Sequence, residues 1–248
     1  MTARRLTLYV LIGAVVYATV LVATFPAPWV AHMVEMASER RIVLRDPAGT
    51  AWDGSGRLYA RQRSGALVDL GAVRWNVSGA AILAGKLGAD LALGEPAKLM
   101  HVEASPASVT LRGLDLEFPG ALLAGFAPEL AALGPEGVVR IRSDSLRIDG
   151  DSVLGLAQIE WRGIRLARAQ DLELGSHVAR LRGAGSKVDI ELGTLDGPLR
   201  LSGGGTWTRD AGLSVSGSAE PRAATLVPFL KSVCAEYRDS RCVFRYKQ

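Results

Sequence analysis

The chain has 248 residues, a formal net charge of +4 and 48% hydrophobic residues, but only 6% aromatic residues. That length suits one large β-domain or two small ones, and its core has to be built mainly from Leu, Val, Ile and Ala. Arg residues stand singly along strand-like stretches and form no basic block. This distribution argues against a nucleic-acid-binding protein, whose cationic residues normally cluster.

The N-terminus carries the clearest physical signal. Residues 6–25, "LTLYVLIGAVVYATVLVATF", contain no charged side chain and follow the basic segment 1–5 with Arg4 and Arg5. As a helix, twenty residues extend about 30 Å, the thickness of the hydrocarbon core of a bilayer. The positive-inside rule then places residues 1–5 in the cytoplasm and the remainder across the membrane. We therefore predict a single-pass transmembrane anchor over 6–25.

A cleaved signal peptide is the alternative, because its apolar region also follows positive charge. That region is usually about 7–15 residues long. The segment here is longer, and Phe25 and Pro26 do not fit a small-residue cleavage site. The uncleaved anchor is the preferred interpretation.

Residues 26–41, "PAPWVAHMVEMASERR", predict a short helix that serves as a stalk or as the first cover of the domain. Trp29, Met33 and Met36 recur at helical spacing. We expect this stripe to be a packing surface.

From residue 42 to residue 248 the period changes to two, which predicts a β-rich domain on the far side of the membrane from residues 1–5. Apolar residues alternate with polar ones in "GKLGADLALG", "SVTLRGLDLEF", "GVVRIRSDSLRIDG" and "SKVDIELG". Such alternation, punctuated by Gly, Asp or Pro, is typical of antiparallel strands with one buried face. Asp149-Gly150 and Asp196-Gly197 are hairpin signals. We expect roughly ten to thirteen strands in a meander.

Two apolar segments interrupt this pattern with helical spacing. In residues 119–134, Leu122, Phe126, Leu130 and Leu133 share one side; in residues 223–239, Leu226, Phe229, Leu230, Val233 and Tyr237 do so. Each segment is predicted to cap an end or a face of a curved sheet. The expected fold is therefore mainly β, with an N-terminal transmembrane helix followed by a curved, mostly antiparallel sheet and a few short capping helices.

The stretch "GTAWDGSGRL", residues 49–58, opens this domain. Its glycines suggest a ligand loop, but strand-like sequence follows them and no helix does. We interpret Gly49 as the end of the connection that leads from the stalk into the β-domain. Trp52 is interpreted as a largely buried side chain packed on the sheet. Asp53-Gly54 is predicted to be the turn of the first hairpin.

Two Trp-containing segments resemble each other. "LGAVRWNVSG" around Trp75 and "LAQIEWRGIR" around Trp161 each read as a strand that ends in Trp and a turn. The short similarity suggests two related β-layers that continue one sheet. A third tryptophan, Trp207, ends the glycine-rich "SGGGTW", which is predicted to be a strand bend.

Cys234 and Cys242 lie close together near the C-terminus. In an oxidising compartment such a pair predicts a local disulfide. Two thiols fill only half of a tetrahedral zinc shell, and His32, His101 and His177 lie far from them in the sequence. No metal site and no cofactor are predicted.

Catalytic motifs are missing from the sequence. "GAGSK" at 183–187 lacks the spacing and the following helix of a phosphate loop. "DGD" at 149–151 lacks the further carboxylates of a calcium loop, and no nucleophile elbow occurs. We therefore expect no enzyme and no small-molecule substrate.

Two functions of different classes fit a membrane-attached β-domain with an aliphatic face. One is an interaction subunit of an envelope complex, whose sheet edges pair with partner strands. The other is a lipid-handling groove, because a curved sheet with an apolar inside can hold an acyl chain. The alternation of residues is compatible with both.

The order of features resembles one family. A basic N-terminus, a single anchor, "GTAWDGSGRL", "VRWNVSG" and finally "GPLRLSGGGTWTRDAGLSVSGSAEP" before an amphipathic segment are similar to the type II secretion system protein N (GspN) family. The sharpest points of resemblance are structural, not catalytic: Gly49, Thr50, Trp52, Gly54, Trp75 and the segment 197–203.

The resemblance implies an inner-membrane accessory component that takes part in the export of folded periplasmic proteins across the outer membrane. It implies other inner-membrane secretion subunits, together with inner-membrane lipid, as partners. Protein C of the same system is a related possibility with a shorter periplasmic region. The layout is also similar to AsmA-like envelope proteins, which supports the alternative of lipid binding or transfer. The family pattern does not account for the two cysteines.

Overall fold

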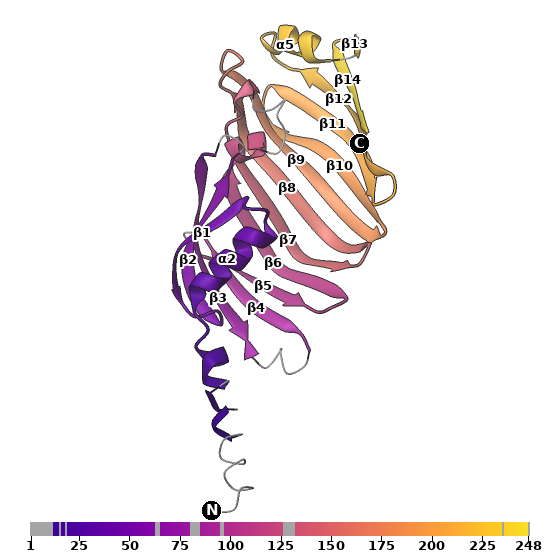
Figure 1. Ribbon diagram of the computed structural model, residues 1–248. Helices are drawn as coiled ribbons and strands as arrows, with labels where there is room; N and C mark the ends of the chain where they lie inside the picture. The colour runs from indigo at the N-terminus through magenta and orange to yellow at the C-terminus, as the bar shows by residue number, and fades with distance from the viewer. Residues whose placement is uncertain are drawn as a thin grey trace, which may run out of the picture.

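The computed structural model describes residues 12–14, 16–17, 19–62, 65–79, 85–94, 97–125, 132–234 and 236–247. Fourteen strands form one antiparallel sheet in the order β1 to β12, then β14 and β13 (Figure 1). Every strand up to β12 thus lies beside its neighbour in sequence. The predictions of a mainly β chain and of a meander are confirmed, although the sheet has one strand more than the upper estimate.

The strands are β1 (Ile42–Gly49), β2 (Asp53–Arg61), β3 (Leu67–Ser78), β4 (Leu87–Leu93), β5 (Lys98–Ala104), β6 (Ser108–Pro119), β7 (Val138–Asp149), β8 (Ser152–Leu166), β9 (Leu172–Gly185), β10 (Lys187–Asp196), β11 (Leu199–Thr208), β12 (Gly212–Pro221), β13 (Glu236–Arg238) and β14 (Arg241–Lys247). The helical elements are α2 (Ala27–Ala37), the 3-10 helix η1 (Gly120–Gly125) and α5 (Leu226–Val233).

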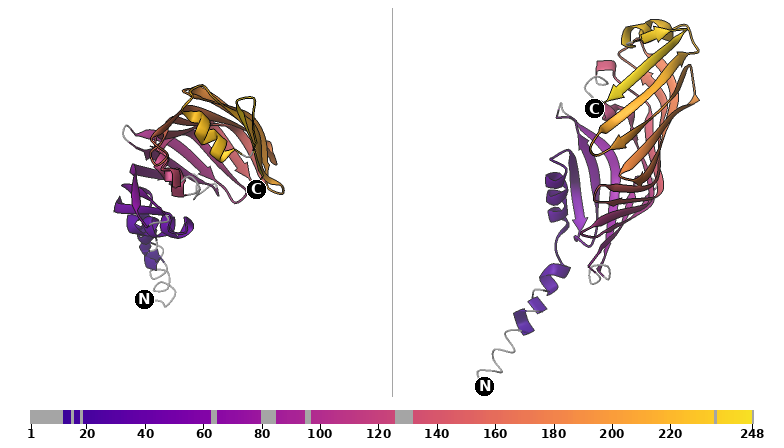
Figure 2. Two further views of the ribbon diagram at one scale, coloured as in Figure 1. Left: turned by 90° about the horizontal axis from the view of Figure 1, so that it is seen from above. Right: turned by 90° about the vertical axis from the view of Figure 1, so that its right-hand side faces the viewer.

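The sheet curves into an open arch, and the two helices lie on its concave side at opposite ends (Figure 2). Helix α2 covers the N-terminal strands, where Ala27, Leu44, Val73 and Trp75 form one buried cluster. Helix α5 covers the C-terminal strands around Leu199, Ala219, Leu226, Leu230 and Cys242, which form a second cluster. Two buried clusters therefore lie at the two ends of the arch, and further buried apolar residues, among them Val139, Ile164 and Val178, lie in the strands between them.

Helix α2 packs on the sheet through a different stripe from the predicted one. Ala27 is fully buried, and Val30 and Ala31 contact the same cluster. Trp29, Met33 and Met36 are 54%, 65% and 66% exposed, so the prediction that they pack on the domain is wrong. Both stripes are apolar and helically spaced, but small alanines let a helix approach a sheet more closely than Trp and Met do.

Helix α5 is shorter than the predicted segment 223–239. It ends at Val233, because Cys234 adopts an extended conformation, and the chain continues as the hairpin of β13 and β14. Tyr237 accordingly lies on β13 and not on a helix. The disulfide between Cys234 and Cys242 joins the end of the helix to β14, a tertiary link that helical periodicity does not reveal.

The predicted helix 119–134 is replaced at its start by η1, which buries Leu122 against the domain. Residues 126–131, with Phe126 and Leu130, lie outside the described residues. Both hairpin signals are confirmed: two residues separate Asp149, the end of β7, from Ser152, the start of β8, and two residues separate Asp196, the end of β10, from Leu199, the start of β11.

The described part of the N-terminal segment is helical at 12–14, 16–17 and 19–23 and extends away from the sheet (Figure 1). Residues 1–11, 15 and 18, which include much of the predicted anchor, lie outside the described residues. Within the described residues, no helix has both the length and the apolar character that crossing a bilayer requires.

Candidate functional site

The concave face of the sheet is lined by rows of apolar residues that run across the strands. Paired residues in adjacent antiparallel strands project from the same face, so the registers trace each row. One row crosses from β6 to β14 through Leu116, Ile141, Ile159, Ala179, Leu192, Gly203, Gly217 and Phe244. The next row contains Ala157, Leu181, Ile190, Gly205, Val215 and Tyr246.

These rows lie on the same face as α5, because Leu201 and Ala219 of the α5 cluster are two residues from Gly203 and Gly217 along their strands. Between the two helices, Ile141, Ile159 and Leu192 are only partly buried. An apolar sheet face is normally covered by a second layer. No helix of the described residues covers the middle of the concave face, and we call this partly exposed apolar surface the groove.

The convex face is polar along the adjacent positions. One row contains Asp115, Arg142, Gln158, Arg180, Glu191, Gly204, Ser216 and Arg245. Apolar and polar rows thus alternate along each strand, as the period of two in the sequence predicts.

A cavity of about 760 Å³ opens where the short hairpin of β4 and β5 leaves a gap in the sheet. The ends of β2 and β3 line one side, and the stretch from Asp115 to Pro119 of β6 lines the other. Its size is that of a small-molecule site. Among the described residues, however, the charged groups of the cavity already pair with one another: Arg57 with Asp69, and Lys98 with Asp115 and Glu117.

Asp115 is the centre of the strongest charge network beside this cavity. Arg140 donates to both carboxylate oxygens, with Nε–Oδ1 and Nη2–Oδ2 distances of 2.7 and 2.6 Å, and Lys98 Nζ lies 3.2 Å from Oδ1. The hydrogen bonds from Arg140 lower the pKa of Asp115 to about 2, against a smaller opposing effect of burial, and Lys98 lowers it further. The sequence analysis did not identify this network, because its members lie far apart in the chain and only the strand register brings them together.

The motif "GTAWDGSGRL" forms the connection between β1 and β2. Thr50, Ala51 and Trp52 make the turn, and the Thr50 hydroxyl accepts hydrogen bonds from the backbone N–H groups of Trp52 and Asp53 at 3.2 and 3.0 Å. Asp53 and Gly54 already belong to β2. The prediction that Asp53-Gly54 forms the turn is therefore wrong, because the Thr50 side chain closes the loop one position earlier.

Trp75, and not Trp52, is the buried tryptophan of this region. Trp75 is 7% exposed, and its indole N–H donates to the backbone oxygens of Thr50 and Ala51 at 3.2 Å each. Gly54 lies directly against its ring, since a Cβ at that position would be 2.4 Å from the ring. Gly49 has a φ of 89° and faces the backbone oxygen of Asp53, so a side chain there would clash.

Trp52 is only partly buried and has a different role from the predicted one. Its indole N–H donates to the backbone oxygen of Val22 at 2.6 Å. Beside it, the N–H of Ala51 donates to the oxygen of Phe25 at 2.7 Å. The motif thus connects the N-terminal helical segment directly to the sheet.

The other predicted motif residues lie apart from this connection. Trp161 is partly buried and donates from its indole N–H to the Glu136 backbone oxygen at 3.0 Å. Trp207 pairs with Val188 and Leu213 at the far end of the sheet. The motif residues therefore do not converge on one site, and the structure assigns them to packing and to connections.

Among the residues that the structure describes, no group of three His, Cys, Asp or Glu side chains is arranged to hold a metal ion. His177 is buried and Val178 beside it in sequence is buried as well. His177 lies within β9, and its burial lowers the pKa of its imidazole.

The geometry is that of a scaffold with an open apolar face, and the family comparison agrees with the resemblance seen in the sequence. The model of the family "Type II secretion system (T2SS), protein N" matches residues 40–232, which is most of the chain. Comparison with curated proteins and with solved structures gives no match. The matched range begins just before β1, includes β1 to β12 and ends within α5, so that β13 and β14 lie beyond it. The chain therefore belongs to the type II secretion system protein N family.

Proposed function

We propose that the chain is a non-enzymatic, single-pass inner-membrane subunit of the type II secretion system that acts through contacts with other subunits. Family membership over residues 40–232 is the observation that carries this proposal. In the proposed topology, residues 1–5 are cytoplasmic and residues 6–25 span the membrane. Residues 26–41 form the stalk that follows the span, and residues 42–248 form the periplasmic domain. The uncharged segment 6–25 after Arg4 and Arg5 supports this topology.

The contacts of Trp52 support a short and firm attachment to the membrane. The bonds from Trp52 to Val22 and from Ala51 to Phe25 hold the end of the proposed span against the β1–β2 turn. No flexible linker separates the two. The domain would therefore be held close to the membrane, in reach of other subunits anchored there.

Deletion of the protein in a secreting strain tests the proposal. We expect the extracellular level of secreted enzymes to fall while the same enzymes accumulate in the periplasm, and a plasmid copy to restore secretion. Normal extracellular levels in the deletion strain would contradict the proposed role. A reporter that is active only in the periplasm, fused after Gln248, should be active; an inactive fusion would contradict the topology.

The groove favours a second candidate function, the binding of an acyl chain as in an AsmA-like envelope protein. The observation behind it is the apolar row through Ile141, Ile159 and Leu192, which is only partly buried and which no helix of the described residues covers. Burial of such a surface by a lipid chain is favourable, at about 0.8 kcal/mol for each CH₂ group.

Adjacent residues on opposite faces of β8 provide a matched test. Ile159→Arg places a charge in the groove, whereas Gln158→Arg places it on the convex face. Lipid that copurifies with the protein, measured by mass spectrometry, should be lost in the first variant and retained in the second. Equal lipid content in both variants, or none in the wild type, would exclude this candidate.

A further inference from the structure

The two lateral edges of the sheet differ in their ability to accept another strand. The edge strand β1 is interrupted by a bulge between Arg45 and Ala48, where Asp46 has a φ of 50° and Pro47 has no N–H to donate. Its C-terminal end is bridged to Pro26. Bulges and prolines are the devices by which proteins close an edge to pairing.

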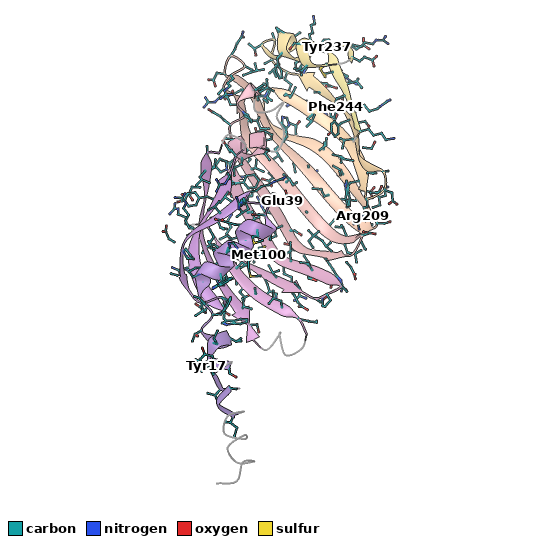
Figure 3. All side chains as sticks on the ribbon, in the orientation of Figure 1. Tyr17, Glu39, Met100, Arg209, Tyr237 and Phe244 are labelled. Carbon is teal, nitrogen blue, oxygen red and sulfur yellow. A yellow bond between two sulfur atoms is a disulfide. The ribbon has the colours of Figure 1, made fainter. Side chains whose placement is uncertain are left out.

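The opposite edge is only partly covered. Strand β13 pairs with Arg241 to Val243 of β14 and then ends, whereas β14 continues to Lys247 along β12. Among the residues that the structure describes, no strand pairs with the outer side of Arg245 and Lys247. Figure 3 labels Phe244 at this edge, with Tyr237 of β13 farther along.

The hairpin turn determines which backbone groups point outward there. Asp239 and Ser240, both with positive φ, form a two-residue turn between Arg238 and Arg241. In such a turn the N–H of the residue after it bonds across to the residue before it. The backbone N–H and C=O groups of Arg241 therefore point toward β13. Because the direction of these groups alternates along a strand, the backbone groups of Val243, Arg245 and Lys247 point to the same side. Beyond the end of β13, the backbone groups of Arg245 and Lys247 face outward, and no strand within the described part of the chain lies opposite them.

The side chains of this free edge have opposite character on the two faces. Arg245 and Lys247 are exposed on the convex face, and neither forms an ion pair with another described residue. Phe244 and Tyr246 lie on the concave face, where they end the two apolar rows of the groove. An incoming strand would therefore meet positive charge on one face and apolar surface on the other.

We propose that the outer edge of β14 at residues 244–247 binds an extended segment of a partner protein, in which acidic residues alternate with apolar ones. The acidic side chains would pair with Arg245 and Lys247 on the convex face, and the apolar ones would extend the groove beyond Phe244 and Tyr246. This inference rests on the proposed function as an interaction subunit, and it names the edge and the chemistry of the partner.

A second copy of this chain does not fit the same edge. Two β14 strands paired about a two-fold axis would bring Arg245 and Lys247 of both copies together, and like charges directly opposite destabilise a strand pair. Pairing of β14 with β1 of another copy would meet the bulge at Pro47. The partner strand is therefore a different, acidic segment.

Binding of a synthetic peptide to the purified full-length protein in detergent tests the charge requirement. The probe is a capped, fluorescent eight-residue peptide with alternating Glu and Val, compared with one of alternating Lys and Val. We expect the Glu peptide to bind at least about tenfold more tightly, and the double variant Arg245→Glu/Lys247→Glu to reverse this preference. Arg180→Glu/Arg182→Glu changes the charge equally in the middle of the convex face and should leave binding unchanged.

A backbone variant tests strand pairing itself. Arg245→Ala removes the charge alone, whereas Arg245→Pro also removes the outward N–H, and proline is tolerated at an edge whose N–H faces solvent. We expect the proline variant to bind the Glu peptide several-fold more weakly than the alanine variant, with the same far-ultraviolet circular dichroism. Equal binding by the two variants, or loss of binding in the mid-sheet control, would overturn the proposal.

Measurements of secretion by the deletion strain and by the double variant distinguish failure of this inference from failure of the proposed function. If deletion reduces secretion and Arg245→Glu/Lys247→Glu reduces it as well, both are supported. If deletion reduces secretion and the double variant secretes normally, the edge proposal fails and the proposed function stands. If deletion has no effect on secretion, the proposed function fails whatever the peptide binds.

Discussion

Trp75 and Trp161 meet the same physical requirement at two places in the sheet. Each projects from the concave face, and each donates its indole N–H to a backbone oxygen of a connecting segment, because an indole N–H removed from water needs an acceptor. Each ring also lies against a glycine, Gly54 for Trp75 and Gly120 for Trp161. The similarity of the two sequence segments thus corresponds to a shared packing arrangement within one sheet.

The ring of Trp75 leaves no room for a side chain at Gly54. Gly54→Val would place its Cβ 2.4 Å from the Trp75 ring, and displacing the ring is expected to cost about 1–3 kcal/mol of unfolding free energy. The thermal midpoint should fall by several degrees in a melt followed by circular dichroism. Gly79→Ala, at a position with no atom within 4 Å of the added Cβ, is the control. An unchanged midpoint for Gly54→Val would contradict the packing described here.

The carboxylate of Asp115 makes stability depend on pH. Its pKa is about 2 in the folded chain and 3.8 without the fold, so the unfolded chain binds more protons between these values. The contribution of Asp115 is therefore fully present above about pH 4 and is lost as the pH falls toward 2. Because the side chain is partly exposed, we expect this contribution to be about 1–2 kcal/mol.

The variant Asp115→Asn should lose this contribution at neutral pH and show a flatter decline of stability between pH 4 and pH 2. Denaturant unfolding at a series of pH values measures both effects. Asp144→Asn, which removes an exposed carboxylate that has no ion pair among the described residues, should follow the wild type. A slope for Asp115→Asn as steep as that of the wild type would show that the network with Arg140 and Lys98 does not stabilise the fold.

At the scale of elements, α2 shows which of two apolar stripes on one helix becomes buried. The stripe with Ala27, Val30 and Ala31 faces the sheet, and the stripe with Trp29 and Met33 faces outward. The backbone of α2 has to approach the sheet closely to contact Leu44 and Trp75. The small side chains of Ala27 and Ala31 permit this approach, whereas side chains as large as Trp and Met would prevent it. Periodicity alone identifies both stripes and cannot rank them.

Substitutions on the two sides of this interface should have unequal effects. Leu44 is 5% exposed under α2, so Leu44→Ala should lower the unfolding free energy by about 2–4 kcal/mol. Met33→Ala removes a side chain of similar size from the outward stripe and should change it by less than about 0.5 kcal/mol. Denaturant unfolding of both variants measures the difference. Comparable losses in the two would mean that α2 packs through the outward stripe.

At the scale of the molecule, the sheet is a nearly one-dimensional array. Each strand up to β12 contacts its neighbours in sequence, and the two buried clusters lie at opposite ends of the arch. In such arrays stability is approximately a sum of local terms and nearest-neighbour terms. The α2 end and the α5 end are therefore expected to open independently.

Native-state hydrogen exchange tests this independence. Leu226→Ala removes a fully buried side chain from the α5 cluster. We expect amide exchange to accelerate in β11, β12 and β14 and to stay unchanged in β2, β3 and β4, because none of the described residues belongs to both the α5 cluster and the α2 cluster. Leu44→Ala should give the converse pattern. Faster exchange throughout the sheet in either variant would indicate a single cooperative unit.

The alternation of apolar and polar residues and the two-residue turns were sufficient to predict an antiparallel meander, because both are local properties and short hairpins make sequence neighbours spatial neighbours. The proximity of Cys234 and Cys242 likewise predicted the bond between them. Family membership followed from the order of such local motifs.

Other features depended on contacts between distant residues, which local patterns do not encode. Only the tertiary structure decided that Trp75 is buried while Trp52 holds the N-terminal segment, and that the helix near the C-terminus stops at Val233. The register between β6 and β7 brought Asp115 to Arg140. Periodicity marks which face of a strand is apolar, but what covers that face depends on the path of the whole chain. Within the described residues, that path leaves the middle of the groove without a covering helix and places no strand beside the outer side of Arg245 and Lys247.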